Sequence, residues 1–413
     1  MKQTRLKFSK LTLAALTISL AGAFSSCKSD DDPTPAYPVT VTQSTPTELG
    51  TNAVVKSGQI TLTEINTGSV TTLALPLDPD IKLTTGTYNV EGQMTVETVA
   101  SNGETVEKTL RAVANQVVIS QTSSAISLNW FFFNPTSSLV FSEIYFAGSP
   151  NAAGTNGLYD TFIRIYNNTD ETIYADGLAI VESKFLNSST DKILTAANDP
   201  EANFTAQTVY VIPGSGKDVA ILPGKSIKIV DQAIDWNEQV AGALNHTDAD
   251  FEWYDETTSA SIKDTDNPAV PNLDKWYSYS ATIWIPSNQC NRSYALVRFP
   301  EGMNADAFLA QQKGDYQYVN AATGKEMSGT KCYLIKNEWI IDGVNLCPTE
   351  KWTRGALSAS VDMSYSAISD KNLDKARFGK KFVRRESGVS SAGNTILMDT
   401  NDSAADFVVT SAK

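Results

Sequence analysis

The sequence is poor in the residues that most often carry enzyme chemistry. It contains one histidine, His246, and four cysteines, none of which form a Cys-x-x-Cys pair. A zinc site of the usual Cys/His kind needs three or four such ligands, so no metal site or other cofactor is expected. A serine hydrolase would have to use His246, which lies in a polar stretch with no nucleophile elbow nearby. We therefore predict that the protein is not an enzyme, although a pair of catalytic carboxylates would leave no mark in the sequence.

Positive charge is also scarce. The chain has 33 lysines and arginines against 46 acidic residues, a net charge of −13. Four of the cations precede Cys27, and the rest of the chain has 29 cations against the 46 acids, a net charge of −17. Binding to nucleic acid needs clustered lysine and arginine, so nucleic acid is excluded as a partner. An acidic surface also disfavours adsorption to anionic lipid, which leaves a lipid anchor as the means of membrane attachment.

Long apolar runs are absent, and the one marked run is short. It extends from Leu11 to Phe24, after a basic start and before Cys27. A membrane span needs roughly 20 apolar residues, whereas a shorter run followed by small residues is typical of a cleaved signal peptide. We predict a lipoprotein signal peptide at residues 1–26 and fatty-acyl chains, such as palmitate, on Cys27. The alternative is a plain signal peptide with an accidental cysteine.

An acidic run follows the predicted lipidation site and forms part of a tether at residues 27–38. Adjacent carboxylates repel one another and stay solvated, so this run can be a simple spacer. It also resembles the export signal of surface lipoproteins in Bacteroidota, which implies the outer leaflet of the outer membrane, facing the extracellular side. The residues that carry this resemblance are Ser29, Asp30, Asp31 and Asp32.

Three cysteines remain after Cys27, namely Cys290, Cys332 and Cys347. An odd number in an oxidising compartment allows at most one disulfide within the chain. The sequence does not decide which pair is bridged, if any.

Residues 39–135 predict a first β-sandwich. Short stretches alternate between apolar and polar residues, as at residues 59–65 and 108–113, and glycine and asparagine turns separate them. Several strands of this length are typical of an antiparallel sandwich. Residues 83–90 resemble a strand of transthyretin-like and carboxypeptidase-regulatory-like domains, which implies an immunoglobulin- or transthyretin-like fold without naming a ligand.

Residues 136–413 predict a second, larger sandwich with long loop insertions. Ile163, Ile165 and Ile173 alternate toward a core, and residues 167–170 have turn chemistry. These stretches resemble a lamin-tail domain, which implies an immunoglobulin-like sandwich and an all-β protein of two domains. The resemblance is carried by residues 139–148, 159–178, 222–230 and 339–344.

A candidate binding loop lies in an insertion at about residues 246–279. It combines carboxylates with aromatic side chains, and such a mixture suits a sugar, a cation or an organic ligand. The alternative is that the aromatics pin a long loop to its scaffold while the acids keep it soluble. The candidate ligand-binding residues are Trp253, Tyr254, Trp276 and Tyr277.

Nearly the whole chain resembles an uncharacterised lipoprotein family of Bacteroidota, domain of unknown function 4876. The resemblance runs from Cys27 through Arg384 and Arg385 to the segment from Asp399 to Phe407. It implies a ligand-binding or accessory protein beside a TonB-dependent nutrient transporter, with an unknown small-molecule, glycan or protein ligand. The alternative is an adhesin or structural surface protein without a small-molecule ligand.

Overall fold

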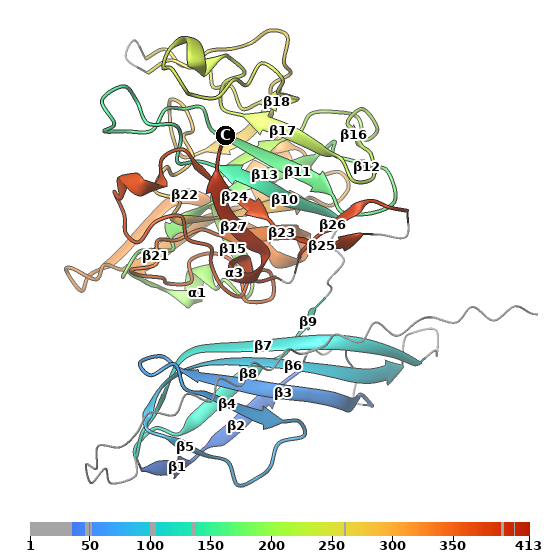
Figure 1. The fold of residues 1–413 in the computed structure, drawn as a ribbon, viewed down its shortest axis with the longest axis vertical. Coiled ribbons are helices and arrows are strands. Elements are labelled where there is room, and N and C mark those ends of the chain that lie inside the picture. The colour runs from blue at the N-terminus through green and yellow to red at the C-terminus, as the bar shows by residue number, and fades with distance from the viewer. Residues whose placement is uncertain are drawn as a thin grey trace, which may run out of the picture.

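A computed structural model describes residues 35–45, 49, 52–99, 105–133, 138–259, 262–389, 392–399 and 401–413. These residues form two bodies, drawn one below the other in Figure 1, with β9 (Phe131–Phe133) between them. Strands make up 45% of the structure and helices 7%, which confirms the all-β fold. The predicted signal peptide, Cys27 and the acidic run lie outside the described residues, as does the predicted domain boundary at residue 135. No helix in the described part of the chain is long and apolar enough to cross a membrane.

The first body is a small sandwich. Its main sheet is antiparallel, with the strand order β4 (Val70–Ala74), β3 (Val54–Glu64), β6 (Gly86–Val99), β7 (Thr105–Ile119) and β9. Short strand pairs complete it, namely β1 (Ala36–Pro38) with β5 (Lys82–Thr84) and β2 (Thr40–Ser44) with β8 (Ala125–Asn129). The pair β2–β8 is parallel, which differs from the antiparallel arrangement predicted. A direct hairpin cannot join parallel neighbours, and here most of the domain lies between the two strands.

The core of the first body follows the predicted alternation. Ile60 and Leu62 of β3 are buried, and Thr61 between them is only half-buried. Leu110 and Ala112 of β7 are buried in the same way. These side chains share one hydrophobic cluster with residues of β5 and β8, so the short strands close the sandwich over the main sheet.

The second body contains two larger sheets. The first has the order β18 (Phe251–Glu252), β17 (Ser226–Val230), β11 (Phe162–Asn167), β10 (Leu139–Tyr145), β24 (Lys380–Arg384) and β27 (Phe407–Ser411). The second has the order β14 (Lys192–Ile193), β21 (Lys313–Val319), β22 (Glu326–Lys336), β15 (Asn203–Val211), β13 (Leu178–Leu186), β20 (Arg292–Arg298) and β23 (Ile340–Asn345), and β19 (Asp274–Ser278) pairs with β15.

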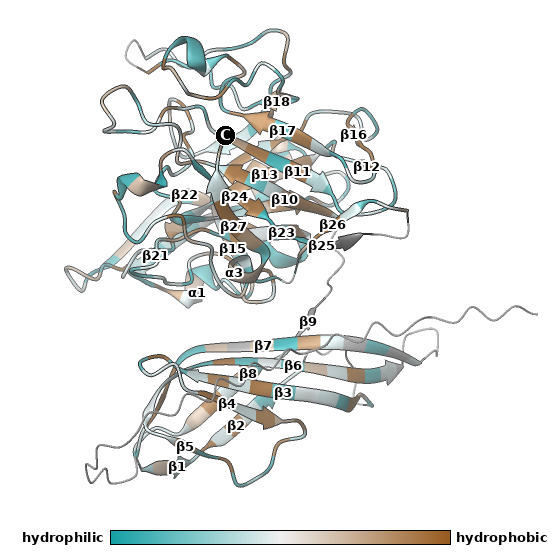
Figure 2. Ribbon diagram, in the orientation of Figure 1, coloured by the Kyte–Doolittle hydropathy of each residue, from teal (hydrophilic) through white to brown (hydrophobic). Residues whose placement is uncertain are grey.

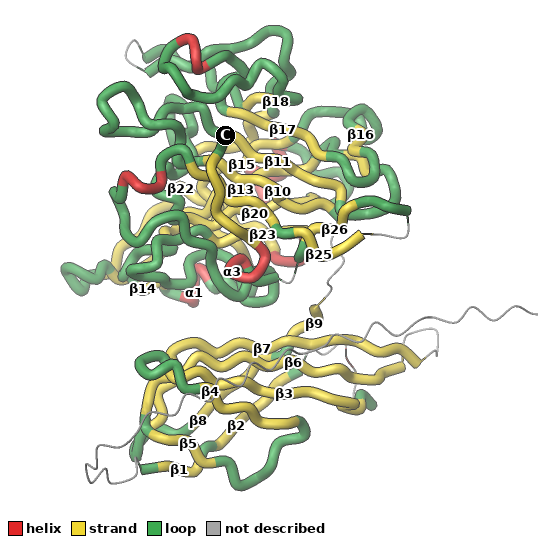
Figure 3. Tube along the Cα trace, viewed as in Figure 1, coloured by secondary structure: helices red, strands yellow, loops and turns green. Residues whose placement is uncertain are grey.

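Smaller elements lie outside the two large sheets, and loops connect most of the elements (Figure 3). They are the strand pairs β12 (Ile173–Tyr174) with β16 (Ala220–Ile221) and β25 (Glu386–Val389) with β26 (Thr395–Leu397), and the helices α1 (Thr195–Asn198), α2 (Ala305–Gln311) and α3 (Ser403–Asp406).

The first four residues of strand β13, 178–181, are buried on both faces of the sheet, and this explains why all four are apolar. Leu178 and Ile180 pack into the core between the two large sheets, beside Ile163 and Ile165 of β11. Ala179 and Val181 pack on the opposite face, beneath α2. Figure 2 shows apolar residues concentrated on the central strands of this body.

One buried arginine joins the C-terminal strands to the sandwich. Both Asp342 carboxylate oxygens lie 2.8 Å from Nη2 of Arg384. Nη1 contacts Asp399 at 3.2 Å and Asp406 at 3.5 Å, and Nε donates to the carbonyl of Phe141 at 2.8 Å. A guanidinium has five donors in a fixed fork, so one side chain can hold four separate segments together.

All three described cysteines are buried, and none of them forms a disulfide. Burial raises the pKa of the Cys290, Cys332 and Cys347 thiols to about 12. These thiols are therefore protonated at neutral pH and serve as packing groups.

Candidate functional site

The predicted binding loop is largely part of the scaffold. Residues 274–278, assigned to the insertion by sequence, form strand β19 and pair with β15. Trp276 consequently packs against Phe299, with ring centroids 5.1 Å apart, and Tyr277 packs against Tyr333 at 4.4 Å. A bulge breaks the alternation of this strand, because Tyr277 pairs with Val209 and Lys275 with Tyr210, which leaves Trp276 unpaired in the ladder. Trp276 and Tyr277 therefore pack against the same hydrophobic cluster. Trp276 and Tyr277 are half-buried and belong to a sheet rather than to a free loop.

Trp253 is also a core residue, with 1% of its surface exposed. Its ring lies 5.2 Å from that of Trp284, which stacks on Tyr210 at 5.0 Å. Trp253 therefore cannot present its ring to a ligand. Tyr254, the fourth residue of the set, is half-buried, and its role in binding stays a prediction.

The carboxylates of this segment attach it to the second sheet and to neighbouring loops. Asp255 is buried and accepts hydrogen bonds from the Tyr210 hydroxyl at 2.7 Å, from Lys275 at 2.6 Å and from the Trp284 amide at 2.6 Å. Glu252 accepts from two backbone amides, at 2.8 and 2.7 Å. These contacts favour the alternative reading, in which the segment is pinned to its scaffold.

His246 has a structural environment. It is 1% exposed, and its Nε2 lies 3.0 Å from the carbonyl oxygen of Asp160. Burial lowers the pKa of His246 to about 4, so the ring is neutral at physiological pH. In the described part of the chain, no group of three or more His, Cys, Asp or Glu residues is arranged to hold a metal ion.

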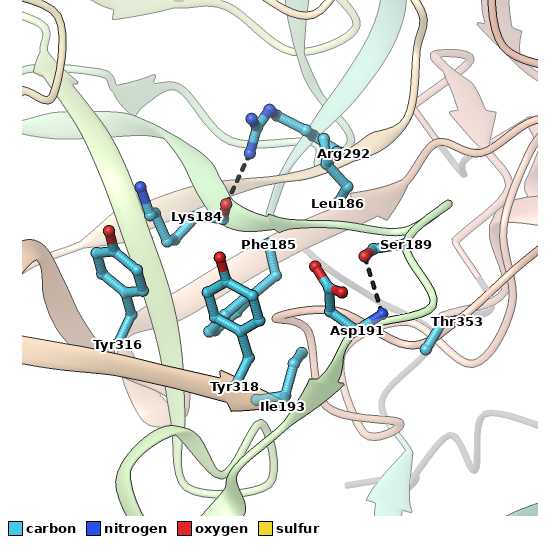
Figure 4. A pocket seen from close by; sticks show the side chains of 10 residues that line it. All are labelled: Lys184, Phe185, Leu186, Ser189, Asp191, Ile193, Arg292, Tyr316, Tyr318 and Thr353. Carbon is cyan, nitrogen blue, oxygen red and sulfur yellow. Dashed lines mark hydrogen bonds between the residues drawn. The ribbon is translucent and has the colours of Figure 1, made fainter. Parts of the chain in front are cut away.

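A cavity of about 220 Å³ opens at another place, where β13 ends and β20 begins. The strands β14 and β21 form its other side (Figure 4). Its lining combines cations, aromatic rings and one carboxylate, and consists of Lys184, Phe185, Leu186, Ser189, Asp191, Ile193, Arg292, Tyr316, Tyr318 and Thr353. Such a mixture of an apolar wall and a few converging polar groups is typical of ligand sites.

A bulge in β13 shapes the back of the cavity. Glu182 pairs with Tyr294 of β20, but the next pair along is Leu186 with Arg292, so β13 has two extra residues. The Arg292 guanidinium donates through Nη1 to the carbonyl of Ser183 at 2.8 Å and to that of Lys184 at 2.9 Å. Its Nε lies 3.8 Å from Glu182 Oε1. Arg292 thereby satisfies the carbonyls that the bulge removes from the ladder, and it fixes the backbone of Lys184.

Lys184 points its ammonium group at aromatic rings. Its Nζ lies 4.2 Å from the centroid of the Tyr316 ring and 5.8 Å from that of Tyr279. It has no ion pair with any carboxylate in the described ranges. Burial, and then the positive charge of Arg292, lower the pKa of Lys184. The ring faces of the tyrosines attract the cation but do not neutralise its charge.

Two tyrosines form the aromatic wall. Tyr316 and Tyr318 are two residues apart on β21, so their side chains leave the same face of the strand. Their rings are nearly parallel, at an angle of 16° with centroids 6.4 Å apart. Figure 4 shows both hydroxyl ends directed toward the side of the cavity that holds Lys184 and Arg292.

Asp191 is the only carboxylate in the lining. Its Oδ1 accepts a hydrogen bond from the Ala321 amide at 2.9 Å, and its own amide donates to the Ser189 hydroxyl at 3.0 Å. The carboxylate is therefore held in place by backbone groups. It can also accept a hydrogen bond from a ligand.

Sequence reasoning did not single out any residue of this cavity. Arg292 and Lys184 are 108 positions apart and meet only because β13 and β20 are neighbours. The one local signal is Tyr316-Gln317-Tyr318, which alternates aromatic and polar residues in a strand pattern. That pattern predicts a strand with an aromatic face, but not what the face meets.

Comparison with known proteins identifies a family over part of the chain. Residues 222–412 match the model of DUF4876, a family described as a protein of unknown function. A crystal structure of a DUF4876 family protein from Bacteroides thetaiotaomicron VPI-5482 is similar, with a TM-score of 0.52 and 18% sequence identity over 90% of this chain and 95% of that one. No curated protein matches the chain. The predicted resemblance to DUF4876 is thus confirmed, and the structural likeness shows a shared fold.

Proposed function

We propose that this DUF4876-like chain is a lipid-anchored protein of the outer-membrane surface that binds a small polar ligand in the cavity at the end of β13. The observation that carries the proposal is Lys184, a half-buried cation without a carboxylate partner among the described residues. A buried charge is costly unless it is paired. Perturbed ionisable groups in a cleft are concentrated at functional sites, where a ligand supplies the missing partner.

The rigidity of the cavity supports this proposal. Lys184, Arg292 and the two tyrosines lie on strands of one sheet, and Arg292 fixes the bulge through two hydrogen bonds. Sites built on strands are held more accurately than sites on free loops, so little ordering is needed when a ligand binds.

A panel of ligands tests for binding. The full-length protein in detergent is heated with monosaccharides, sugar acids, amino acids or nucleosides, because a ligand that binds only the folded state raises the melting temperature. At least one class should stabilise the native protein and fail to stabilise Thr353→Trp, which fills the cavity from its rim. If no class stabilises the native protein, the cavity does not act as a small-molecule site, and the adhesin or structural role is the better reading.

The anchor is proposed from the sequence alone. Cys27→Ser should abolish labelling by fatty acid and release the protein from the membrane fraction. A variant that still partitions with the membrane would contradict lipidation at Cys27.

The surface location is tested separately. Replacing Asp30, Asp31 and Asp32 with alanine should keep the lipid but protect the protein from protease added to whole cells. Unchanged cleavage would show that the acidic run is only a spacer. Co-purification from the outer membrane then tests for a TonB-dependent transporter as the partner.

A further inference from the structure

The cavity concentrates positive charge on an acidic protein. The chain has a net charge of −13, yet the lining of the cavity includes Lys184 and Arg292, and Lys331 adds a third positive charge that acts on Lys184. Asp191 forms no ion pair with either lining cation. A neutral ligand would leave the ammonium of Lys184 with aromatic rings as its partners and no opposite charge, so the electrostatics favour an anion.

We infer that the ligand is a ring-shaped organic anion with one carboxylate, which Lys184 binds while the ring lies against Tyr316 and Tyr318. This inference rests on the proposed function, because it names the class of ligand for the same cavity. Lys184 then selects a negatively charged ligand, and the two tyrosines select a ligand with a ring.

One negative charge fits the donors better than two. Arg292 already uses Nη1 on two carbonyls, and its Nε faces Glu182, so its charge is partly committed to the scaffold. Lys184 is the lining cation that has no carboxylate partner among the described residues, and its contacts are to aromatic rings. A phosphate would bring a charge near −2 and meet Asp191 in the same cavity, where like charges repel.

The remaining groups fit a hydroxylated ring. The cavity of about 220 Å³ is smaller than the roughly 300–1,000 Å³ of sites for drug-sized ligands, which limits the occupant to about one ring. The tyrosine faces can pack against the apolar face of such a ring, and Asp191 can accept a hydrogen bond from a hydroxyl. A sugar acid of the uronic type combines all three features.

Isothermal titration of the full-length protein in detergent tests the inference. The probes are glucuronate and galacturonate, with glucose and galactose as neutral counterparts and inorganic phosphate as a second anion. We expect a uronate to bind about tenfold or more tighter than its neutral counterpart, because a hydrogen bond to a charged group is strong. Lys184→Met should remove this preference, and Lys184→Arg should keep part of it.

Lys192→Met is the matched control, since Lys192 lies on β14 beside the cavity but is exposed and does not line it. Its affinities should equal those of the native protein. The uronate preference should also weaken as the pH rises toward 10.5, the ordinary pKa of lysine, and it should do so earlier than for an ordinary lysine because the pKa of Lys184 is lowered.

The outcomes separate the inference from the proposed function. Equal binding of uronate and neutral sugar, unaffected by Lys184→Met, would overturn the assignment of charge and leave a binding cavity in place. Tighter binding of phosphate than of uronate would overturn the assignment of the ligand as a ring with a carboxylate. If none of these probes binds while another class in the ligand panel does, the ligand class is wrong and the proposed function stands.

Discussion

In the first body the buried side chains are almost all apolar, whereas the second body also buries carboxylates, amides and an arginine. Glu64 and Thr98 are the buried polar residues described in the first body. The second buries several polar groups deeply, including Arg384, Asp362 and Asp231. The comparison shows two ways of specifying a β-sandwich. One uses alternation along each strand, and the other adds polar contacts between segments that are distant in sequence.

The loops explain why the second body needs such contacts. Many of its connections are long (Figure 3). The backbone groups of a long loop find no partners in a strand ladder, and ordering the loop costs conformational entropy. Asp362 illustrates the solution, since its carboxylate accepts from the Ser403 hydroxyl and from the amides of Ser403 and Asn345. One buried side chain thus holds its own loop to strand β23 and to helix α3, which an apolar residue could not do through hydrogen bonds.

The largest effect should come from Arg384. Arg384→Met would leave the carboxylates of Asp342, Asp399 and Asp406 buried without their cation. Breaking a buried ion pair on one side costs about 3–5 kcal/mol of unfolding free energy. Chemical denaturation measures this loss, with Arg385→Met as the control because Arg385 is exposed. A loss of unfolding free energy below about 1 kcal/mol would mean that the ion pairs of Arg384 do not stabilise the second body.

An apolar truncation should have a somewhat smaller effect in the first body. Leu62 is fully buried, so Leu62→Ala should cost about 2–5 kcal/mol. Ile65→Ala is the control, since Ile65 is 46% exposed, and it should change stability by less than about 0.5 kcal/mol. Equal losses for the two variants would contradict a core set by alternation.

Removing one buried carboxylate of the second body should increase the stability of the protein. Asp231 is buried, and its Oδ2 has no hydrogen-bond partner among the described residues. Burial, and then Asp264, raise the pKa of Asp231 well above 3.8. The folded state therefore binds its proton more tightly than the unfolded state, and stability falls as the pH rises above 3.8 through the raised pKa.

Asp231→Asn should thus stabilise the protein at pH 8 by about 1–3 kcal/mol, because the amide stays neutral and avoids the cost of ionising a buried carboxyl group. The gain should vanish near pH 3.8. Thermal melts across this range measure it, and Asp266→Asn is the exposed control. A gain that does not depend on pH would show that ionisation of Asp231 is not its source.

The smallest effect concerns Glu64 of the first body, and its sign is opposite. Hydrogen bonds from Thr67, Asn66 and Thr87 lower the pKa of Glu64 to about 2. Its contribution to stability is therefore present above pH 4.5 and lost as the pH falls toward 2. Glu64→Gln should remove this part of the acid sensitivity, as followed by thermal melts between pH 2 and 5. If the melting temperature of Glu64→Gln falls with pH in the same way as that of the native protein, groups other than Glu64 cause the loss of stability in acid.

The strands were predictable wherever one face is buried and the other is wet. Ile60 and Leu62 alternate with polar residues, as do Ile163 and Ile165, and both pairs are buried as expected. The period of two is a property of the extended backbone itself, so it is visible without knowledge of the neighbours. Strand β19 was missed because a bulge at Trp276 interrupts its period of two, so both Trp276 and Tyr277 pack against one cluster.

The sequence by itself determined the all-β class, the acidic surface and the short apolar run before Cys27, because each is a property of composition or of residues close along the chain. Only the tertiary structure decided that Trp253 is covered by Trp284, that the three thiols stay unpaired, and that Lys184 meets Arg292 and Tyr316. The residues in these contacts are more than thirty positions apart in the sequence, and they meet only through the packing of whole sheets and their loops. A charge that reads as an ordinary surface residue therefore becomes a half-buried cation without a carboxylate partner among the described residues only when the second body closes around it.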